Sequence, residues 1–200
     1  PKCSVTVPSI ASIIVSKYAD SLPLYRQEQI FARAGIELGR DKMARWILTI
    51  GEKLSPLVAL LHKDLLASEV VSMDETTLQV LKEKGRAASS KSFILVQARE
   101  GPPGRNIILF HYNQSRAGQV IASYLPNFKG ILLTDGLEVY KSYCRPRPEV
   151  VHAGCWSHCR RKFAEAQKGI KASKRSGSAA HEALALIDTL FKIEGEGKNL

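Results

Sequence analysis

The stretch EVVSMDETTLQVL, residues 69–81, alternates in side-chain character along its length. Ser72 and Asp74 are interleaved with the apolar residues Val71 and Met73. Because successive side chains of a β-strand point to opposite faces, this period of two predicts a strand with one polar and one apolar face. Asp74 is therefore expected on the polar face of the first strand of a sheet.

A second aspartate, Asp135, stands near the end of the apolar run GILLTDG, residues 130–136. The run predicts a strand buried on both faces. A carboxylate in such a segment is unfavourable unless a cation or a hydrogen-bond donor compensates its charge, so Asp74 and Asp135 suggest a shared metal site. Two alternatives stay open: Asp135 belongs to an Asp-Gly turn, and Asp74 lies with Glu75 in a solvated patch on an edge strand.

The sequence between these two strands predicts two more strands and a helix. In chain order the expected elements are a polar, mobile connection (82–91), a strand (92–100), a turn (100–105), a strand (106–113) and a helix that Ser115 caps and Pro126 ends. The order strand, strand, strand, helix, strand predicts an α/β fold with a mixed sheet. The first three strands can form an antiparallel meander, and the helix is the crossover that returns the fourth strand parallel to the first.

This order has a consequence for the two acids. If the first and fourth strands are neighbours, Asp74 and Asp135 face each other near the middle of the sheet. Their carboxylates could then bridge two divalent ions ~3.5–4 Å apart, the arrangement used for in-line displacement at phosphodiesters. Mg²⁺ suits such a site because it prefers oxygen ligands.

The first 68 residues predict four helices. Ser9 is the expected cap of the first helix, Pro23 suits the first turn of the second, and Ser55-Pro56 is expected to separate the third from the fourth. Three leucines of the fourth helix are expected to be buried: Leu57, Leu61 and Leu65. Residues 25–50 have the length and central glycine of a helix-turn-helix, but two helices packed on a neighbouring domain give the same pattern.

The chain is basic, with 29 Lys and Arg against 19 Asp and Glu, a net charge of +10. Residues 140–175 carry most of this excess, as expected for a protein that binds a polyanion such as nucleic acid; a solvated, lysine-rich surface is the alternative. Four irregularly spaced cysteines fit a reducing compartment. The stretch 3–16 falls short of the ~20 apolar residues of a membrane span, so we expect a cytoplasmic protein. Because it begins at Pro1, the chain is expected to be a fragment.

Residues 152–163, HAGCWSHCRRKF, gather cysteine, histidine and basic side chains. On a helix, His152, Cys155 and Cys159 would share one face and could bind zinc. In the alternative, the cysteines are small core residues and His158 is hydrogen-bonded. Three basic residues that follow would project toward the phosphates of a bound strand, or form a solvent-facing basic turn: Arg160, Arg161 and Lys162.

Several segments of the chain resemble, in the same order, the central part of bacterial transposases of the insertion sequence 66 (IS66) family, within the DDE superfamily. They extend over about residues 9–170. The matching segments are KYADSLPLYRQEQIFARAGIEL (17–38), the helix around Arg45-Trp46, SMDET (72–76), SRAG (115–118), GILLTDG (130–136) and GCWSHCRRKF (154–163).

The resemblance implies a ribonuclease H-like catalytic core that cleaves and joins DNA at transposon ends. It divides the chain into an N-terminal helical region (1–68), an incomplete core (69–170) and a linker with the start of a helical insertion (171–200). Asp74 and Asp135 correspond to the first two acids of the DDE triad, which would bind two Mg²⁺ or Mn²⁺ ions. The third acid, a glutamate, is expected beyond Leu200, so the fragment alone is expected to be inactive.

The resemblance also gives expectations about motifs and partners. Cys155 and His158 match a Cys-x-x-His signature with a structural or DNA-positioning role. Leu137 stands where the family usually has an aromatic residue, and of the upstream cysteine module only Cys3 remains. The expected partners are DNA ends and target DNA, a homo-oligomer on DNA and accessory transposition proteins, at the bacterial nucleoid and without a membrane. The rival hypotheses are a non-catalytic DNA-binding or assembly module and a nuclease that acts on RNA or hybrids.

Overall fold

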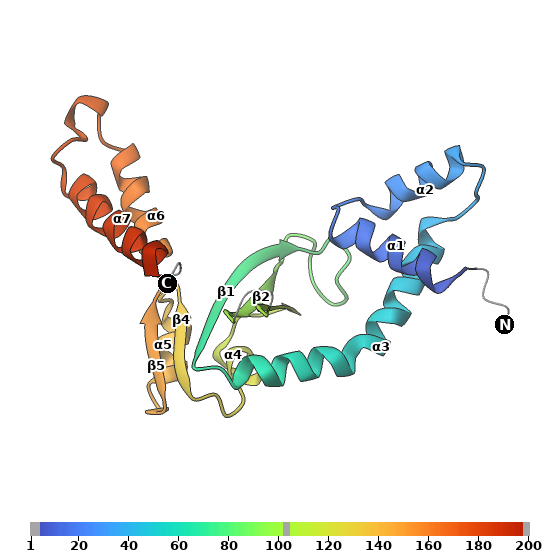
Figure 1. Ribbon diagram of the computed structural model, residues 1–200, viewed down its shortest axis with the longest axis horizontal. Helices are drawn as coiled ribbons and strands as arrows, with labels where there is room; N and C mark the ends of the chain where they lie inside the picture. Colours follow the sequence, from blue (N-terminus) through green and yellow to red (C-terminus); the bar gives the residue numbers. More distant parts are fainter. Residues whose placement is uncertain (1–4, 102–104, 198–200) are drawn as a thin grey trace. The chain divides into compact units, whose positions relative to one another are not determined.

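The computed structural model describes residues 5–101 and 105–197 (Figure 1). Internal contacts divide the chain into two compact units, Pro1–Leu61 and His62–Leu200. The boundary between them falls inside helix α3, Arg40–Leu66. Half of the turn predicted at 100–105, residues 102–104, lies outside the described residues.

The first unit begins with helices α1, Val7–Tyr18, and α2, Leu24–Arg33. Helix α1 starts two residues before the predicted cap, because the Oγ1 of Thr6 accepts the backbone N–H of Ser9 at 3.4 Å. Ser9 therefore lies in the first helical turn and the prediction that it caps the helix is wrong. Pro23 is the N-cap residue of α2, one position before the first turn in which it was predicted.

Helix α3 continues through Pro56, so the predicted break at Ser55-Pro56 is wrong. Proline has no N–H for the carbonyl of residue i−4, here Glu52. The Ser55 hydroxyl donates to that carbonyl at 2.8 Å and replaces the missing hydrogen bond. Of the three leucines expected to be buried, Leu57 is 53% exposed and Leu61 36%, and only Leu65 is buried.

The second unit contains a five-stranded mixed sheet, in the order β3-β2-β1-β4-β5. Its strands are β1 (Val70–Gln79), β2 (Lys91–Arg99), β3 (Ile107–Asn113), β4 (Gly130–Thr134) and β5 (Val150–Gly154). The first three strands are antiparallel, whereas β4 runs parallel to β1 and β5 parallel to β4. Helix α4, Gly118–Tyr124, is the connection between β3 and β4. The antiparallel pairing of the first three strands and the parallel pairing of the first strand with the fourth are confirmed, whereas the predicted strand order is incomplete.

The sheet extends further than the sequence predicted. After β4 the chain forms helix α5, Glu138–Cys144, and strand β5, neither of which was predicted. The expectation that β4 is buried on both faces is also too simple, because Leu132 and Thr134 are buried while Ile131 and Leu133 are half-buried. The strand is short, and only one of its faces meets the core.

The hydrophobic core lies on one face of the sheet. Strands contribute Val71, Met73, Leu95 and Leu132, helices contribute Leu65, Ile121, Tyr140 and Tyr143, and Leu125 directly follows α4. Because strand residues alternate between faces, Ser72 and Asp74 lie on the face opposite this core. The predicted polar face of β1 is thus the outer face of the sheet.

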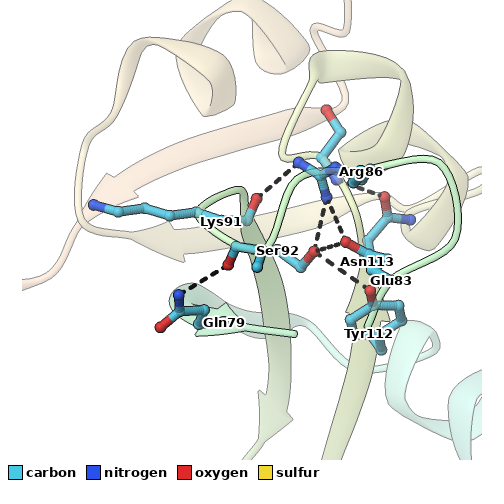
Figure 2. A network of polar contacts seen from close by, with 9 residues as sticks. Gln79, Glu83, Arg86, Lys91, Ser92, Tyr112 and Asn113 are labelled. Carbon is cyan, nitrogen blue, oxygen red and sulfur yellow. Dashed lines mark hydrogen bonds and ion pairs between the residues drawn. The ribbon is translucent and has the colours of Figure 1, made fainter. Parts of the chain in front are cut away.

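The connection between β1 and β2 is polar, as predicted, and a hydrogen-bond network holds it against the sheet (Figure 2). The largely buried carboxylate of Glu83 accepts hydrogen bonds from Arg86 at 3.0 Å and from the Ser92 hydroxyl at 2.8 Å. Burial opposes ionisation of Glu83, but these donors and Gln114 outweigh it and lower the pKa of the carboxyl. The network anchors the start of β2.

The C-terminal part of the chain is a helical hairpin. Helix α6, Trp156–Lys168, leads through the short helix η1, Ala172–Lys174, to helix α7, Ala179–Gly197, and α6 packs against α7 (Figure 1). Among the residues that the structure describes, no helix has the length and apolar character required to cross a membrane.

Candidate metal and nucleic-acid site

The sheet sets the two predicted acids level with each other on neighbouring strands, Asp74 in the middle of β1 and Asp135 directly after β4. In the parallel register of β1 and β4, Ser72 is the partner of Leu133. Continued by two residues, this register sets Asp74 level with Asp135, which directly follows β4. Both positions belong to the outer face, where the side chain of Asp74 is 52% exposed. The site is therefore open to solvent and to a ligand.

Local hydrogen bonds orient both carboxylates. The Oδ1 of Asp74 accepts the backbone N–H of Glu75 at 2.9 Å, and the Oδ1 of Asp135 accepts that of Leu137 at 3.0 Å. The second contact is a turn, made possible by Gly136, whose φ of +83° lies in the region that glycine adopts most easily. Asp135 is thus a turn residue, and the turn holds its carboxylate in place.

His158 is the side chain that meets Asp74. It lies in the first turn of α6, and its Nε2 is 3.4 Å from the Oδ2 of Asp74. Its Nδ1 is buried and has no hydrogen-bond partner in the described part of the chain. A proton on Nδ1 would be a buried, unpaired donor, so the tautomer with the proton on Nε2 is favoured. His158 therefore presents an N–H to Asp74.

Two pockets meet at the start of α6. The smaller, of about 220 Å³, is lined by Asp74 together with Val96 and Leu133 of the sheet. The larger, of about 610 Å³, is lined by Asp135, Trp156 and Lys162. Two residues line both pockets: Cys155 and His158. The predicted Cys-x-x-His motif thus lies between the positions of the two acids.

Donors to the buried carboxylate of Glu75 support the site from the core side. The Glu75 side chain is 4% exposed and accepts hydrogen bonds from the Tyr140 hydroxyl at 2.5 Å and from Arg116 at 3.2 Å. Burial and the charge of Glu75, then those of Asp135 and Asp74, raise the pKa of Tyr140. This cluster was not predicted from the sequence, although Glu75 alternates with Asp74 and must face the core, where a carboxylate needs donors.

Thr134 connects the end of β4 to His152 of β5 and to Cys155, which directly precedes α6. Its hydroxyl is 2.8 Å from the Nε2 of His152 and accepts the N–H of Gly136 at 3.2 Å, while its carbonyl accepts the N–H of Cys155 at 2.7 Å. Burial, followed by the charge of Lys141, lowers the pKa of His152, although Asp135 partly opposes this effect. These bonds fix the turn that carries Asp135.

The zinc hypothesis required a single helix, and the structure does not provide it. His152 is in β5 and Cys155 directly precedes α6, so only Cys159 of the three is helical. Within residues 5–101 and 105–197 there is no group of three or more His, Cys, Asp or Glu side chains placed to hold a metal ion. The described residues therefore offer two carboxylates from adjacent strands, and no complete ligand set.

The three basic residues of α6 have different surroundings. Arg160 binds Asp188 of α7 through two nitrogens, at 2.6 and 3.3 Å, which raises the pKa of the guanidinium and lowers that of the carboxyl. Arg161 and Lys162 are exposed, and Lys162 lines the Asp135 pocket. Arg160 thus connects the two helices, while its two neighbours face solvent.

Comparison with known proteins gives a consistent assignment. The family described as "Transposase IS66 family" matches residues 2–199. Two similar proteins of Sinorhizobium fredii (strain NBRC 101917 / NGR234) are called uncharacterized protein y4qI and uncharacterized protein y4jD. The first is 33% identical over 198 residues, which cover 94% of this chain and 35% of the relative. The second is 32% identical over 201 residues, which cover 96% and 38%. The chain spans little more than a third of the length of these relatives, and it belongs to the IS66 family of transposases.

Proposed function

We propose that the second unit is the metal-binding part of a DNA transposase that cleaves DNA and transfers strands at insertion-sequence ends. The observation that carries the proposal is the parallel pairing of β1 with β4, whose register sets Asp74 level with Asp135 on the outer face of the sheet. The sheet, with three antiparallel strands followed by two parallel ones, supports a ribonuclease H-like core. Family membership supports the reaction.

The chemistry of the two acids fits Mg²⁺ or Mn²⁺, because both ions prefer carboxylate oxygen ligands. When two such ions are bound, they activate the attacking oxygen and stabilise the leaving oxygen of a phosphodiester. Asp74 and Asp135 would hold them. We propose that the third ligand is a glutamate beyond residue 200.

Neighbouring residues would prepare the two acids for this role. The turn at Gly136 holds the carboxylate of Asp135, and the Nε2 of His158 points at the carboxylate of Asp74. Both carboxylates would therefore already be ordered before a cation binds. Tyr140 and Arg116 compensate the charge of Glu75, which keeps that carboxylate on the core side. Arg161 and Lys162 would bind DNA phosphates.

Calorimetric titration of the chain with Mn²⁺ tests the metal site. We expect binding in the wild-type chain, and its loss in the Asp74→Asn and Asp135→Ala variants. Asp41→Asn is the matched control, since that exposed aspartate pairs with Arg45 in the first unit. Unchanged binding in both site variants would overturn the assignment. In the complete transposase, Asp74→Asn should abolish strand cleavage and leave DNA binding intact.

The second candidate is a non-catalytic DNA-binding or assembly module. The net charge of +10 and the exposed Arg161 and Lys162 favour it, as does the lack of a third acid at the site among the described residues. This hypothesis predicts salt-sensitive DNA binding that Asp135→Ala does not change, and no Mn²⁺ binding. For either candidate we propose DNA as the partner, a homo-oligomer on DNA with accessory transposition proteins, and a location at the bacterial nucleoid.

A further inference from the structure

Trp156 is an exposed indole beside a candidate catalytic acid. It is the first residue of α6, it is 53% exposed, and it lines the pocket of about 610 Å³ that also contains Asp135. In the described part of the chain, its side chain has no aromatic, cationic or hydrogen-bonding partner. The only other tryptophan, Trp46, is half-buried and has Lys42 over its ring. An unpaired indole of this size is suited to bind a ligand.

The pocket has space for a flat ring next to this indole. Gly154 contributes to the wall, and a Cβ added there would meet no atom within 4 Å. Apolar side chains predominate in the lining, which favours an uncharged aromatic ligand over a solvated ion. The volume also lies in the range of about 300–1,000 Å³ that is usual for sites of small organic groups.

The charged groups of the pocket indicate what the ring is attached to. Lys162 offers a cation at one part of the lining, and Asp135 marks the place where the proposed metal site would meet a phosphodiester. A ligand that combines an aromatic ring with phosphates on both sides is a nucleotide within a strand. A base that is paired in a duplex cannot offer its face to an indole, so the ring has to be an unpaired base.

We propose that Trp156 is a stacking platform for an unpaired base of the DNA strand whose backbone passes between Lys162 and Asp135. The proposal rests on the proposed function for the identity of the ligand, and it adds a binding role for a residue outside the metal site. Base stacking on an aromatic side chain is sequence-tolerant, because every base has a π-face. Trp156 would therefore hold the strand near the metal site without reading its sequence.

Fluorescence of Trp156 tests directly whether a base stacks on its indole. In a Trp46→Phe background Trp156 is the only tryptophan, since the chain has two. The protein is titrated, without divalent metal, with a short single-stranded oligodeoxynucleotide and with an oligomer of equal length that has abasic sites in place of bases. The two carry the same phosphates, so they differ only in the groups that can stack. We expect quenching by the first oligomer and none by the second.

Substitutions at position 156 give an independent measure. Trp156→Ala should weaken binding of the base-bearing oligomer roughly 5- to 150-fold and leave binding of the abasic oligomer unchanged, and Trp156→Phe should restore part of the loss. Equal quenching by both oligomers, or equal affinity of the alanine and wild-type chains for DNA, would overturn the proposal. The oligomer comparison needs no change at position 156, so it holds even if the alanine variant folds poorly.

A further variant separates this proposal from the proposed function. Asp74 does not line the Trp156 pocket, so Asp74→Asn should lose Mn²⁺ binding and keep the quenching. Quenching without metal binding in the wild-type chain would support the stacking platform and refute the metal site. Metal binding without quenching would support the metal site and refute the stacking platform.

Discussion

The hydroxyl of Tyr140 offers a direct test of how the site is supported. Tyr140→Phe removes only this group, which donates to the Oε2 of Glu75 at 2.5 Å. The Tyr140 ring is fully buried, so the phenylalanine keeps the packing. Glu75 itself is 4% exposed and would retain Arg116 alone, at 3.2 Å. The variant therefore isolates one hydrogen bond to a buried carboxylate.

The expected loss of stability follows from this geometry. A hydrogen bond to a charged group contributes about 1.5–3 kcal/mol, and its loss leaves a buried acceptor without that donor. Arg116 is 51% exposed, so solvent screens its interaction and it cannot compensate. We expect the free energy of unfolding of the second unit to fall by about 1.5–3 kcal/mol. For a chain of this size the melting temperature would fall by about 3–12 °C.

Urea unfolding monitored by circular dichroism measures this change. The matched control is Tyr112→Phe, whose hydroxyl donates to the neutral Ser92 hydroxyl at 3.3 Å. A weaker neutral bond should contribute only about 0.5–1 kcal/mol. The reasoning is refuted if Tyr140→Phe destabilises the protein no more than Tyr112→Phe does.

The pH dependence of stability provides a second test of the contact between Tyr140 and Glu75. Its pKa is raised in the folded protein, so the neutral phenol stabilises the fold fully below the ordinary value of 10.0, and this contribution is lost as the pH rises above it. Tyr140→Phe should therefore be less sensitive than the wild type to pH above 10.0. Equal alkaline sensitivity of the two proteins would argue against the contact.

Three other changes have outcomes that the structure predicts. Burial, with the nearby charge of His62, lowers the pKa of His111, so the stability of the fold should decrease as the pH falls below the ordinary value of 6.5. His111→Asn should therefore flatten the curve of melting temperature against pH. Gly136→Ala should destabilise the fold by about 1 kcal/mol and weaken Mn²⁺ binding, because φ at this position is +83°, whereas Gly51→Ala, inside α3 and without a close neighbour, should be neutral or stabilising in thermal melts. Pro56→Ala restores an N–H for the carbonyl of Glu52 and should raise the helical circular dichroism signal and the melting temperature of the first unit; a lower melting temperature would show that the proline is required.

Local sequence patterns were sufficient to predict the strands whose side chains alternate clearly and the connection between them. The period of two around Asp74 predicted β1, and the helix before GILLTDG predicted a parallel return beside it, because a crossover of that length has few other solutions. Neighbouring strands at Asp74 and Asp135 could therefore be expected from the sequence. The family resemblance, which rests on ordered motifs, also required no coordinates.

Other features depend on contacts between distant segments. Strand β5 exists because five residues pair with β4, and a run that short has no helical or strand period of its own. This pairing places His152 in the sheet, whereas Cys159 is in α6, so the single helical face predicted to bind zinc does not form. Arg160 met Asp188 from a helix 28 residues away, and Glu75 met Tyr140 across 65 residues.

The sequence by itself determined which residue types are present, the alternation that forms the strands and the family to which the chain belongs. Only the tertiary structure decided which of the charged groups are engaged by partners and which, with Trp156, line the pocket beside Asp135. The physical reason is that periodicity reports the direction of a side chain from its own backbone, whereas its partner is set by the packing of elements far apart in the chain.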